Sequence, residues 1–448
     1  MVVGEISSSI DVLVIGGGPG GYTAALKAAS LGKSVTLVER GAIGGVCLNV
    51  GCIPSKALIR AARVYSTAHE GASIGVDASA SIDLAVTQRW IAGVVEQLTG
   101  DVAGLLRRAK VNVVIGTAHF TRRTRAVIAH GDGVEHVEFD TAIVATGSRP
   151  IELEVLPFDR RRVIDSTDAL RLTSVPSQLV VVGGGYIGVE LACAYRRLGS
   201  AVAIVEQADR VLPSMYEPLG RVVQRDLAAR GVEVVTGAVV RGDDGRAVHL
   251  DDGRSLAADI VLVAVGRRPN TDDVGLAAAG VQLDDRHRID VDSMRRSRSA
   301  PSILAVGDVT AGPALAHKAM VEADVAGAVA AGKRAAFDPA CIPEVVFADP
   351  EVVSVGLTPG AAVAAGLDVV TRRRAIGSVG RALVEGTRSG YFEIVADRDG
   401  GTVRGVHIAG PGVSELSGEA ALAIEMGATL DDLALTAHAH PTMSELFR

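Results

Sequence analysis

The sequence predicts an α/β protein with two similar α/β domains in tandem, followed by a third domain of α+β type. Two observations support this prediction: glycine-rich turns that follow short apolar runs, and an N-terminal segment that recurs later in the chain with the same spacing. The chain has 448 residues, of which 52 are glycine, and aromatic residues make up only 3%. Short runs of Val, Ile and Ala beside glycine are typical of buried strands that turn tightly into helices. This length leaves room for two to four domains.

The composition excludes several classes of protein. The formal net charge is −7 and the isoelectric point is near 5.8, which argues against a nucleic-acid or anionic-membrane partner. Asp11, Glu190 and glycine clusters interrupt the longest apolar runs, so no transmembrane helix is expected. No basic residue precedes the first apolar run, as a signal peptide would require. We therefore expect a cytoplasmic protein.

Residues 12–39 and 179–206 are two copies of one unit. Each copy contains an apolar strand, a glycine turn, a helix and a second strand that ends in glutamate. In both copies the glutamate lies 23 residues after the first glycine. The corresponding residues are Gly16, Gly18, Gly21 and Glu39 in the first copy and Gly183, Gly185, Gly188 and Glu206 in the second.

The glycine spacing has a physical explanation in dinucleotide binding. The first glycine permits a tight turn, the second lets a pyrophosphate approach the backbone, and the third lets the helix pack closely on the strand. The phosphates then lie at the positive end of the helix, and the glutamate can accept hydrogen bonds from a ribose. One such pattern is weak evidence, but two in the same context favour dinucleotide binding over ordinary α/β turns. The sequence therefore predicts two tandem Rossmann-like dinucleotide-binding domains.

A strand, a glycine turn and an Arg-Pro pair close each copy. Gly147 and Gly266 each lie seven residues after an aspartate. A later strand ends in Gly307-Asp308, which suits a polar contact to a sugar or polyol. We therefore predict four parts of the chain: a first dinucleotide-binding domain 1–150, a second 151–270, a central segment 271–336 that completes the first site, and an α+β domain 337–448.

Two of the four cysteines, Cys47 and Cys52, lie five residues apart in a Gly-rich segment. In a reducing compartment such a pair indicates redox or metal chemistry rather than a structural disulfide. On a regular helix the two would be separated by about 7.5 Å along the axis, beyond the usual reach of a disulfide. We therefore expect Cys47 on a non-helical turn before a helix that starts near Pro54, whose N-terminus would lower a thiol pKa. A zinc site and an inert pair are the alternatives, but no second close pair completes four zinc ligands.

His438 and His440 form the other distinctive feature. Pro441 follows His440, and Glu445 is near enough in the chain to orient its imidazole and raise its basicity. A dithiol must lose protons before it attacks a disulfide, so redox chemistry at the cysteine pair needs a base. Two dinucleotides and a cysteine pair together indicate electron transfer between a nicotinamide nucleotide, a flavin and a dithiol.

Over essentially the whole chain these motifs resemble the flavoprotein disulfide reductases, class I of the pyridine nucleotide-disulfide oxidoreductase family. GGVCLNVGCIPSKAL at 44–58 resembles the redox segment of the dihydrolipoyl dehydrogenase branch, and AHAHPTMSE at 437–445 resembles its base segment. The resemblance implies that Cys47 exchanges with lipoyl sulfur and that Cys52 lies against the flavin. It also implies that His440, oriented by Glu445, acts as the base from the other subunit of a homodimer, which makes the C-terminal domain a dimerisation domain.

The same resemblance implies the cofactor contacts, including a pair between Lys56, near the flavin, and Glu190. For FAD they are Gly16, Gly18, Gly21, Glu39, Lys56, Ala118, Thr146, Gly147, Asp308, Ala316 and His317. For NAD they are Gly183, Gly185, Gly188, Glu190, Glu206, Val240 and Gly266.

The implied activity is reoxidation of dihydrolipoyl groups in a 2-oxo acid dehydrogenase complex, with electrons passing through the cysteine pair and FAD to NAD⁺. The lipoyl domain of the acyltransferase would be the partner.

Alternatives to this activity stay open. A mercuric reductase usually ends in a vicinal cysteine pair, where this chain has ELFR. Glutathione reductases prefer NADP, and Glu206 would repel the 2′-phosphate of NADP, although Arg210 lies nearby. A non-catalytic flavin-binding subunit is a further alternative, and the complete cysteine, histidine and glutamate set argues against it.

Overall fold

The computed structural model describes residues 7–131, 133–387 and 389–448. The chain forms two compact units, and two of the boundaries between them fall within helices α3 (Cys52–Glu70) and α4 (Leu84–Arg108). The first unit contains Met1–Ser55, Gln88–Pro150 and Arg267–Asp338; the second contains Lys56–Thr87, Ile151–Gly266 and Pro339–Arg448. Among the described residues, none of the helices is long and apolar enough to cross a membrane.

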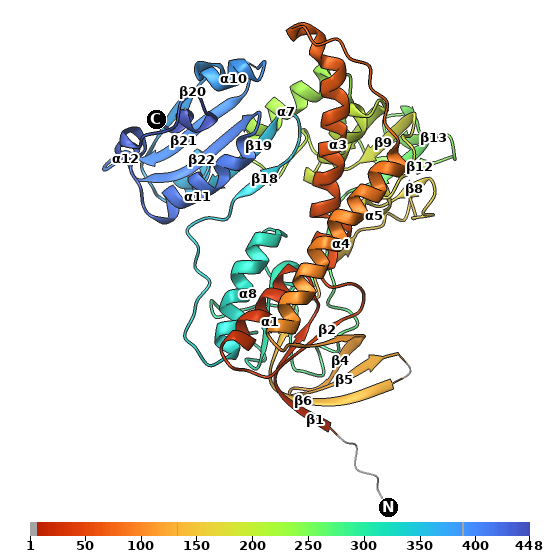
Figure 1. Cartoon of the computed structure of the whole chain (residues 1–448), viewed down its shortest axis with the longest axis vertical. Coiled ribbons are helices and arrows are strands. Elements are labelled where there is room, and N and C mark those ends of the chain that lie inside the picture. Colours follow the sequence, from red (N-terminus) through yellow and green to blue (C-terminus); the bar gives the residue numbers. More distant parts are fainter. Residues whose placement is uncertain (1–6, 132, 388) are drawn as a thin grey trace, which may run out of the picture. The chain divides into compact units, whose positions relative to one another are not determined.

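The first unit is built on a seven-stranded sheet with the order β3-β2-β1-β6-β5-β4, in which β17 also pairs with β6. β1 is parallel to β2 and β6, and its residues Val12, Leu13 and Val14 are fully buried, as expected for a central parallel strand. Helices α1 and α8 pack side by side within this unit (Figure 1). The strands are β1 Ser7–Ile15, β2 Val35–Glu39, β3 Asn112–Ile115, β4 Thr117–Arg122, β5 Arg125–His130, β6 Gly133–Val144 and β17 Ile303–Ala305. The helices are α1 Pro19–Ser30, α2 Gly45–Val50, η2 Gly307–Val309 and α8 Ala316–Ala330.

The second unit contains a five-stranded sheet with the order β11-β10-β9-β15-β8. β9 is parallel to β10 and β15, which repeats the arrangement of β1 with β2 and β6. This repetition confirms the two Rossmann-like sheets predicted from the sequence. The strands are β8 Val163–Ile164, β9 Gln178–Val182, β10 Ala201–Glu206, β11 Glu233–Thr236 and β15 Ile260–Val263. The helices are η1 Gly71–Ile74, α5 Ser166–Ala169, α6 Tyr186–Arg197 and α7 Glu217–Ala229.

Two small antiparallel sheets complete these parts. A three-stranded sheet in the second unit consists of β12 Val240–Asp243, β13 Ala247–Leu250 and β14 Ser255–Ala257. A two-stranded sheet in the first unit pairs β7 Ser148–Pro150 with β16 Arg267–Pro269. The chain leaves the first unit after β7 and returns to it at β16.

The C-terminal part is an antiparallel five-stranded sheet with the order β18-β19-β22-β21-β20. This sheet and its helices confirm the predicted α+β domain. Its core takes in Leu446 and Phe447 near the C-terminal end, which are 0% and 3% exposed. The strands are β18 Glu344–Val346, β19 Glu351–Gly356, β20 Val369–Arg374, β21 Tyr391–Asp397 and β22 Val403–Gly410. The helices are α9 Pro359–Ala364, η3 Ile376–Ser378, α10 Gly380–Val384, η4 Val413–Leu416, α11 Ser417–Glu425, α12 Leu430–Leu435 and η5 Met443–Phe447.

Candidate functional site

The turn between β1 and α1 can be built only with glycine at two of its three motif positions. Gly16 has φ +104°, and a Cβ there would lie 2.3 Å from the carbonyl oxygen of Ala145. A Cβ on Gly21 would lie 1.7 Å from the carbonyl oxygen of Gly16. At Gly18, the N-cap of α1, a Cβ would meet nothing nearer than 3.8 Å, and no side chain caps the helix. The first N–H groups of α1 therefore remain available to a phosphate.

The second copy repeats this geometry at the turn between β9 and α6. Gly183 has φ +108°, and a Cβ there would lie 2.5 Å from the carbonyl oxygen of Ala264. A Cβ on Gly188 would lie 2.0 Å from the carbonyl oxygen of Gly183, whereas at Gly185 it would meet nothing within 4 Å. Two turns of one design thus follow β1 and β9, each of which is a parallel strand in the middle of its own sheet.

Glu39 ends β2 with its carboxylate held in place. Its Oε2 accepts from the Gly17 N–H at 2.6 Å, and its Oε1 accepts from the Gly41 N–H at 2.7 Å. A carboxylate oxygen can accept more than one hydrogen bond, so the anchored group can still bind ribose hydroxyls.

Glu206 is anchored in the same way at the end of β10. Its Oε2 accepts from Gly184 at 2.6 Å and its Oε1 from Ala208 at 2.7 Å. The nearby Arg210 does not offer a mobile cation, because its Nη2 donates to the carbonyl oxygen of Pro213 at 2.9 Å. The geometry thus places a fixed negative charge, rather than a phosphate-binding guanidinium, at the end of the strand.

The other predicted cofactor contacts distribute between the two units. Lys56 and Glu190, on helices α3 and α6, form an ion pair in the second unit at 2.8 Å between Nζ and Oε2. In the first unit Ala118 is buried on β4, Thr146 and Gly147 follow β6, Asp308 lies in η2, and Ala316 and His317 open α8. In the second unit Val240 begins β12 and Gly266 follows β15.

Phe347 is a contact of this ion pair that the sequence analysis missed. Its backbone N–H donates to Glu190 Oε1 at 3.0 Å, and the Lys56 Nζ lies 4.5 Å from the centre of its ring. An aromatic face attracts a cation, so Phe347 holds both members of the pair. No sequence signal could have singled it out, since it lies 157 residues from Glu190 and belongs to no motif.

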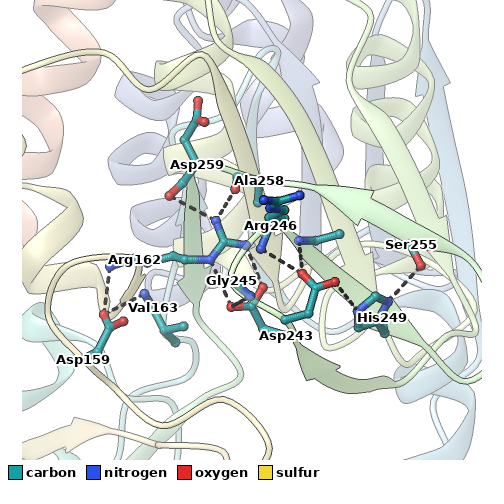
Figure 2. A network of polar contacts seen from close by, with 12 residues as sticks. Asp159, Arg162, Val163, Asp243, Gly245, Arg246, His249, Ser255, Ala258 and Asp259 are labelled. Atoms are coloured by element: carbon teal, nitrogen blue, oxygen red, sulfur yellow. Dashed lines mark hydrogen bonds and ion pairs between the residues drawn. The ribbon is translucent and has the colours of Figure 1, made fainter.

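The sheet that carries Val240 is fixed by the polar network in Figure 2. Arg162 binds Asp243, at the other end of β12, through Nη2 to Oδ1 at 2.6 Å and Nε to Oδ2 at 3.0 Å. The same guanidinium donates to the carbonyl oxygen of Ala258, beyond β14. The hydrogen bonds to Asp243 raise the pKa of Arg162. This network ties the small sheet to the residue that precedes β8.

The two cysteines lie on different helices, which corrects the predicted local structure. Cys47 lies within α2 and not on a non-helical turn, whereas the predicted helix start near Pro54 is confirmed, since α3 begins at Cys52. The chain breaks between the helices at Gly51, with φ −140° and ψ −106°, where a Cβ would lie 2.9 Å from the carbonyl oxygen of Val46. The prediction put the break before Cys47, whereas it lies between the cysteines. Cys47 and Cys52 are therefore not separated by the rise of one continuous helix.

Tyr22 lies beside this cysteine segment. Burial raises the pKa of its phenol, and Cys47 and Cys52, when ionised, add to that rise. Both cysteines are half-buried in the first unit, which also contains the first dinucleotide-binding turn.

His440 and Glu445 form a hydrogen-bonded pair. His440 Nδ1 lies 3.0 Å from Glu445 Oε2, and the Thr442 N–H donates to Glu445 Oε1 at 2.9 Å. These contacts hold the pKa of Glu445 below its usual value. An ionised carboxylate can only accept, so the proton is assigned to Nδ1 and Nε2 is the basic nitrogen. The His440 side chain is 76% exposed, so that nitrogen can be reached from outside.

The segment that bears this pair is fixed from two sides. Leu446 and Phe447 insert into the core of the C-terminal domain. Arg374, on the edge strand β20, donates to the carbonyl oxygen of Glu445 at 2.8 Å. His438, which the sequence analysis noted without a role, is buried and pairs with Glu419 at 2.8 Å. The His440–Glu445 pair is therefore carried by a segment that is anchored in the C-terminal domain.

Comparisons with known proteins agree with this geometry. The profile of the family described as pyridine nucleotide-disulphide oxidoreductase matches residues 10–323, and that of its dimerisation domain matches residues 342–448. The chain is 45% identical to a dihydrolipoyl dehydrogenase of Geobacillus stearothermophilus and 44% identical to one of Bacillus subtilis. Both alignments cover 100% of this chain and 96% of the relative.

Solved structures show the same fold. The crystal structure of LpdA from Mycobacterium tuberculosis matches with a TM-score of 0.91 at 28% identity, over 98% of both chains. The HOCl-induced flavoprotein disulfide reductase RclA from Escherichia coli matches with a TM-score of 0.85 at 26% identity, over 98% of this chain and 99% of that one. The family resemblance drawn from the motifs is thereby confirmed, and this chain belongs to the pyridine nucleotide-disulphide oxidoreductase family.

Proposed function

We propose that this protein is a dihydrolipoyl dehydrogenase, which reoxidises dihydrolipoyl groups and passes their electrons to NAD⁺. The observation that supports it best is the pair Cys47 and Cys52, on either side of the break at Gly51, in the same unit as the first dinucleotide-binding turn. The dihydrolipoyl dehydrogenases that match over the full chain agree with this activity.

The first unit would hold FAD and the second NAD. The open space at Gly18 and the uncapped start of α1 fit a pyrophosphate, and Glu39 fits the ribose that follows it. Gly185 and Glu206 offer the same fit in the second unit. Asp308, in η2 just beyond β17, would bind the polyol chain of the flavin nucleotide. Bound FAD would supply two-electron exchange between the dithiol and the nicotinamide.

The cysteine pair would perform the thiol chemistry. One thiolate of the dihydrolipoyl group attacks Cys47 in the Cys47–Cys52 disulfide, and Cys52 leaves as a thiolate. The N-terminus of α3, which begins at Cys52, favours that negative charge. His440 Nε2 takes the proton of the second substrate thiol, which then attacks the mixed disulfide and releases Cys47 with the oxidised lipoyl product.

We propose further that the protein acts as a homodimer, with His440 serving the partner's cysteines. The match of residues 342–448 to a dimerisation domain supports this. Within the second unit, residues 441–444 line a cavity of about 1170 Å³ together with Arg63 and Thr67 of α3. These two residues lie 7 and 11 positions after Lys56, about 10–16 Å along the helix axis. A base segment placed there is remote from Lys56, the residue proposed to lie near the flavin.

The lipoyl domain of a 2-oxo acid dehydrogenase acyltransferase is the proposed partner, and the cytoplasm is the proposed location. The division of the chain at residues 150, 270 and 336 also remains a proposal.

One assay tests the function. The purified protein is given lipoamide, glutathione disulfide or mercuric ion, each with NADH or NADPH. Lipoamide with NADH should be reduced fastest. Faster turnover of glutathione disulfide or mercuric ion would make the protein another reductase of the family. Bound flavin without turnover of any of the three would favour a non-catalytic subunit.

A further inference from the structure

We propose that Ser148 is a positioning residue for Asp308, and that Arg267 fixes the direction in which the Ser148 hydroxyl donates. The proposal rests on the proposed function, in which Asp308 binds the polyol chain of FAD. It assigns a role to two residues outside the dinucleotide motifs.

The Ser148 hydroxyl lies between a cation and an anion. Arg267 Nε is 2.8 Å from Ser148 Oγ, and Ser148 Oγ is 2.5 Å from Asp308 Oδ2. A second guanidinium nitrogen, Nη2, donates to the Ser148 carbonyl oxygen at 2.7 Å. Ser148 is only 5% exposed. The three groups therefore form a chain of hydrogen bonds whose central hydroxyl is buried, with Arg267 and Asp308 half-buried on either side.

The chemistry of the three groups fixes the direction of the chain. A guanidinium can only donate, so the hydroxyl must accept from Arg267. An ionised carboxylate can only accept, so the hydroxyl proton must point to Asp308. A hydrogen bond to a charged acceptor is stronger than one between neutral groups. Ser148 thus holds the Asp308 carboxylate in one orientation.

The backbone beneath Asp308 is held separately. The Gly307 N–H donates to Glu322 Oε2 at 2.6 Å, and Lys318 Nζ lies 3.3 Å from the Gly307 carbonyl oxygen. Glu322 is itself paired with Lys318 at 2.9 Å and with Arg295 at 2.8 Å, and all three side chains are buried. Because these contacts fix the turn without Ser148, loss of its hydroxyl should free the carboxylate while leaving the fold intact.

The position of Arg267 adds a second consequence. It is the first residue of β16, where the chain returns from the second unit, and Ser148 is the first residue of β7, shortly before the chain departs. Through Arg267 and Ser148, the two strands at which the chain leaves and re-enters the first unit are therefore hydrogen-bonded to the carboxylate proposed to hold FAD.

The test compares Ser148→Ala with Ser302→Ala. Ser302 also lies in the first unit, and within the described residues its buried hydroxyl has no hydrogen-bond partner. Flavin release on heating and the dissociation constant of FAD are measured for both holoproteins. We expect Ser148→Ala to weaken FAD binding about 10- to 100-fold, the effect of losing one hydrogen bond to a charged group. Ser302→Ala should match the unmodified protein.

A double-mutant cycle shows whether Ser148 acts through Asp308. In an Asp308→Asn background, where the carboxylate is gone, Ser148→Ala should cause much less further loss of FAD affinity. Equal losses in both backgrounds would overturn the proposal, as would FAD binding by Ser148→Ala as tight as that of Ser302→Ala. If Ser148→Ala does not fold, Arg267→Gln replaces it in the same cycle and must show the same dependence on Asp308. Failure of the unmodified protein to bind FAD would instead refute the proposed function.

Discussion

Replacement of Glu206 by glutamine would test the preference for NADH over NADPH. The change keeps the size of the side chain and removes its charge. In the structure both carboxylate oxygens accept backbone N–H groups, from Gly184 at 2.6 Å and Ala208 at 2.7 Å. This anchoring prevents the carboxylate from swinging aside to admit a 2′-phosphate. We therefore expect a strong preference for NADH in the unmodified protein.

The size of the effect follows from two contributions. Hydrogen bonds from the ribose to a charged acceptor contribute about 1.5–3 kcal/mol, against about 1 kcal/mol for a neutral one, so the glutamine variant should lose about 1–2 kcal/mol of NADH binding. A 2′-phosphate about 6 Å from the carboxylate would be repelled by about 2–3 kcal/mol at an effective dielectric constant of 20. Together these amount to about 3–5 kcal/mol, so the preference should narrow by roughly two to four orders of magnitude.

The internal repeat provides the matched control. Glu39 is anchored by Gly17 and Gly41 at the same two distances, 2.6 and 2.7 Å. Steady-state kcat/KM for NADH and for NADPH is measured in the unmodified protein, Glu206→Gln and Glu39→Gln. Only Glu206→Gln should change the ratio, whereas Glu39→Gln should weaken FAD retention. The reasoning is refuted if the ratio is unchanged in Glu206→Gln, or if both variants shift it equally.

Three further predictions concern the thiol chemistry. Cys47→Ser should show a long-wavelength charge-transfer absorption band without reductant, because Cys52 stays as a thiolate beside the flavin; a band only in Cys52→Ser would reverse the assignment. The pKa of Glu445 is lowered by His440 and the Thr442 N–H, so its carboxylate should stay ionised below its usual pKa; Glu445→Gln should then reduce lipoamide kcat/KM about 10- to 100-fold, and an unchanged pH–rate profile would deny it a role. When Cys47→Ser and His440→Ala chains are refolded together, about half the dimers should be mixed and about a quarter of all sites should recover activity; no recovery despite mixed dimers would place His440 at the cysteines of its own chain.

The parts of the fold that the sequence predicted are those with local signatures. Gly16 and Gly183 have positive φ and no room for a Cβ. Only glycine can occupy these two positions, so the glycine pattern in the sequence identifies both turns. The domain order followed from that repeat. The local structure around Cys47 and Cys52 was harder to predict. The helix α2 is only six residues long, and its end depends on the close approach of Gly51 to the Val46 carbonyl. Nothing in the local sequence distinguishes that break from a turn placed a few residues earlier.

The site shows the same limit over longer distances. The His440–Glu445 pair was accessible to sequence reasoning because the partners lie five residues apart. The Ser148–Asp308 contact spans 160 residues, and the contact between Phe347 and Glu190 spans 157. Serine and phenylalanine are common residues, and only the pairing of β7 with β16 or the packing of the C-terminal domain brings them to charged groups. Such residues can be found only once the fold is known.

The two sheets also differ in a way that the repeat conceals. In the first, β17 pairs with β6 through three residues and then enters η2, where Asp308 extends from the end of the sheet. In the second, β8 takes the corresponding place beside β15, but it ends at Ile164.

The aspartate that follows β8 is already occupied. Asp165 accepts from the N–H groups of Thr167 and Asp168 as the cap of α5, and it binds Arg160 at 2.7 Å. The same place in the sheet therefore carries the carboxylate proposed to bind FAD in the first domain and a structural cap in the second. Under the proposed function, FAD in the first domain would gain a polar contact that the second domain does not offer at this strand. This difference would favour a flavin that stays bound and a nicotinamide nucleotide that is released.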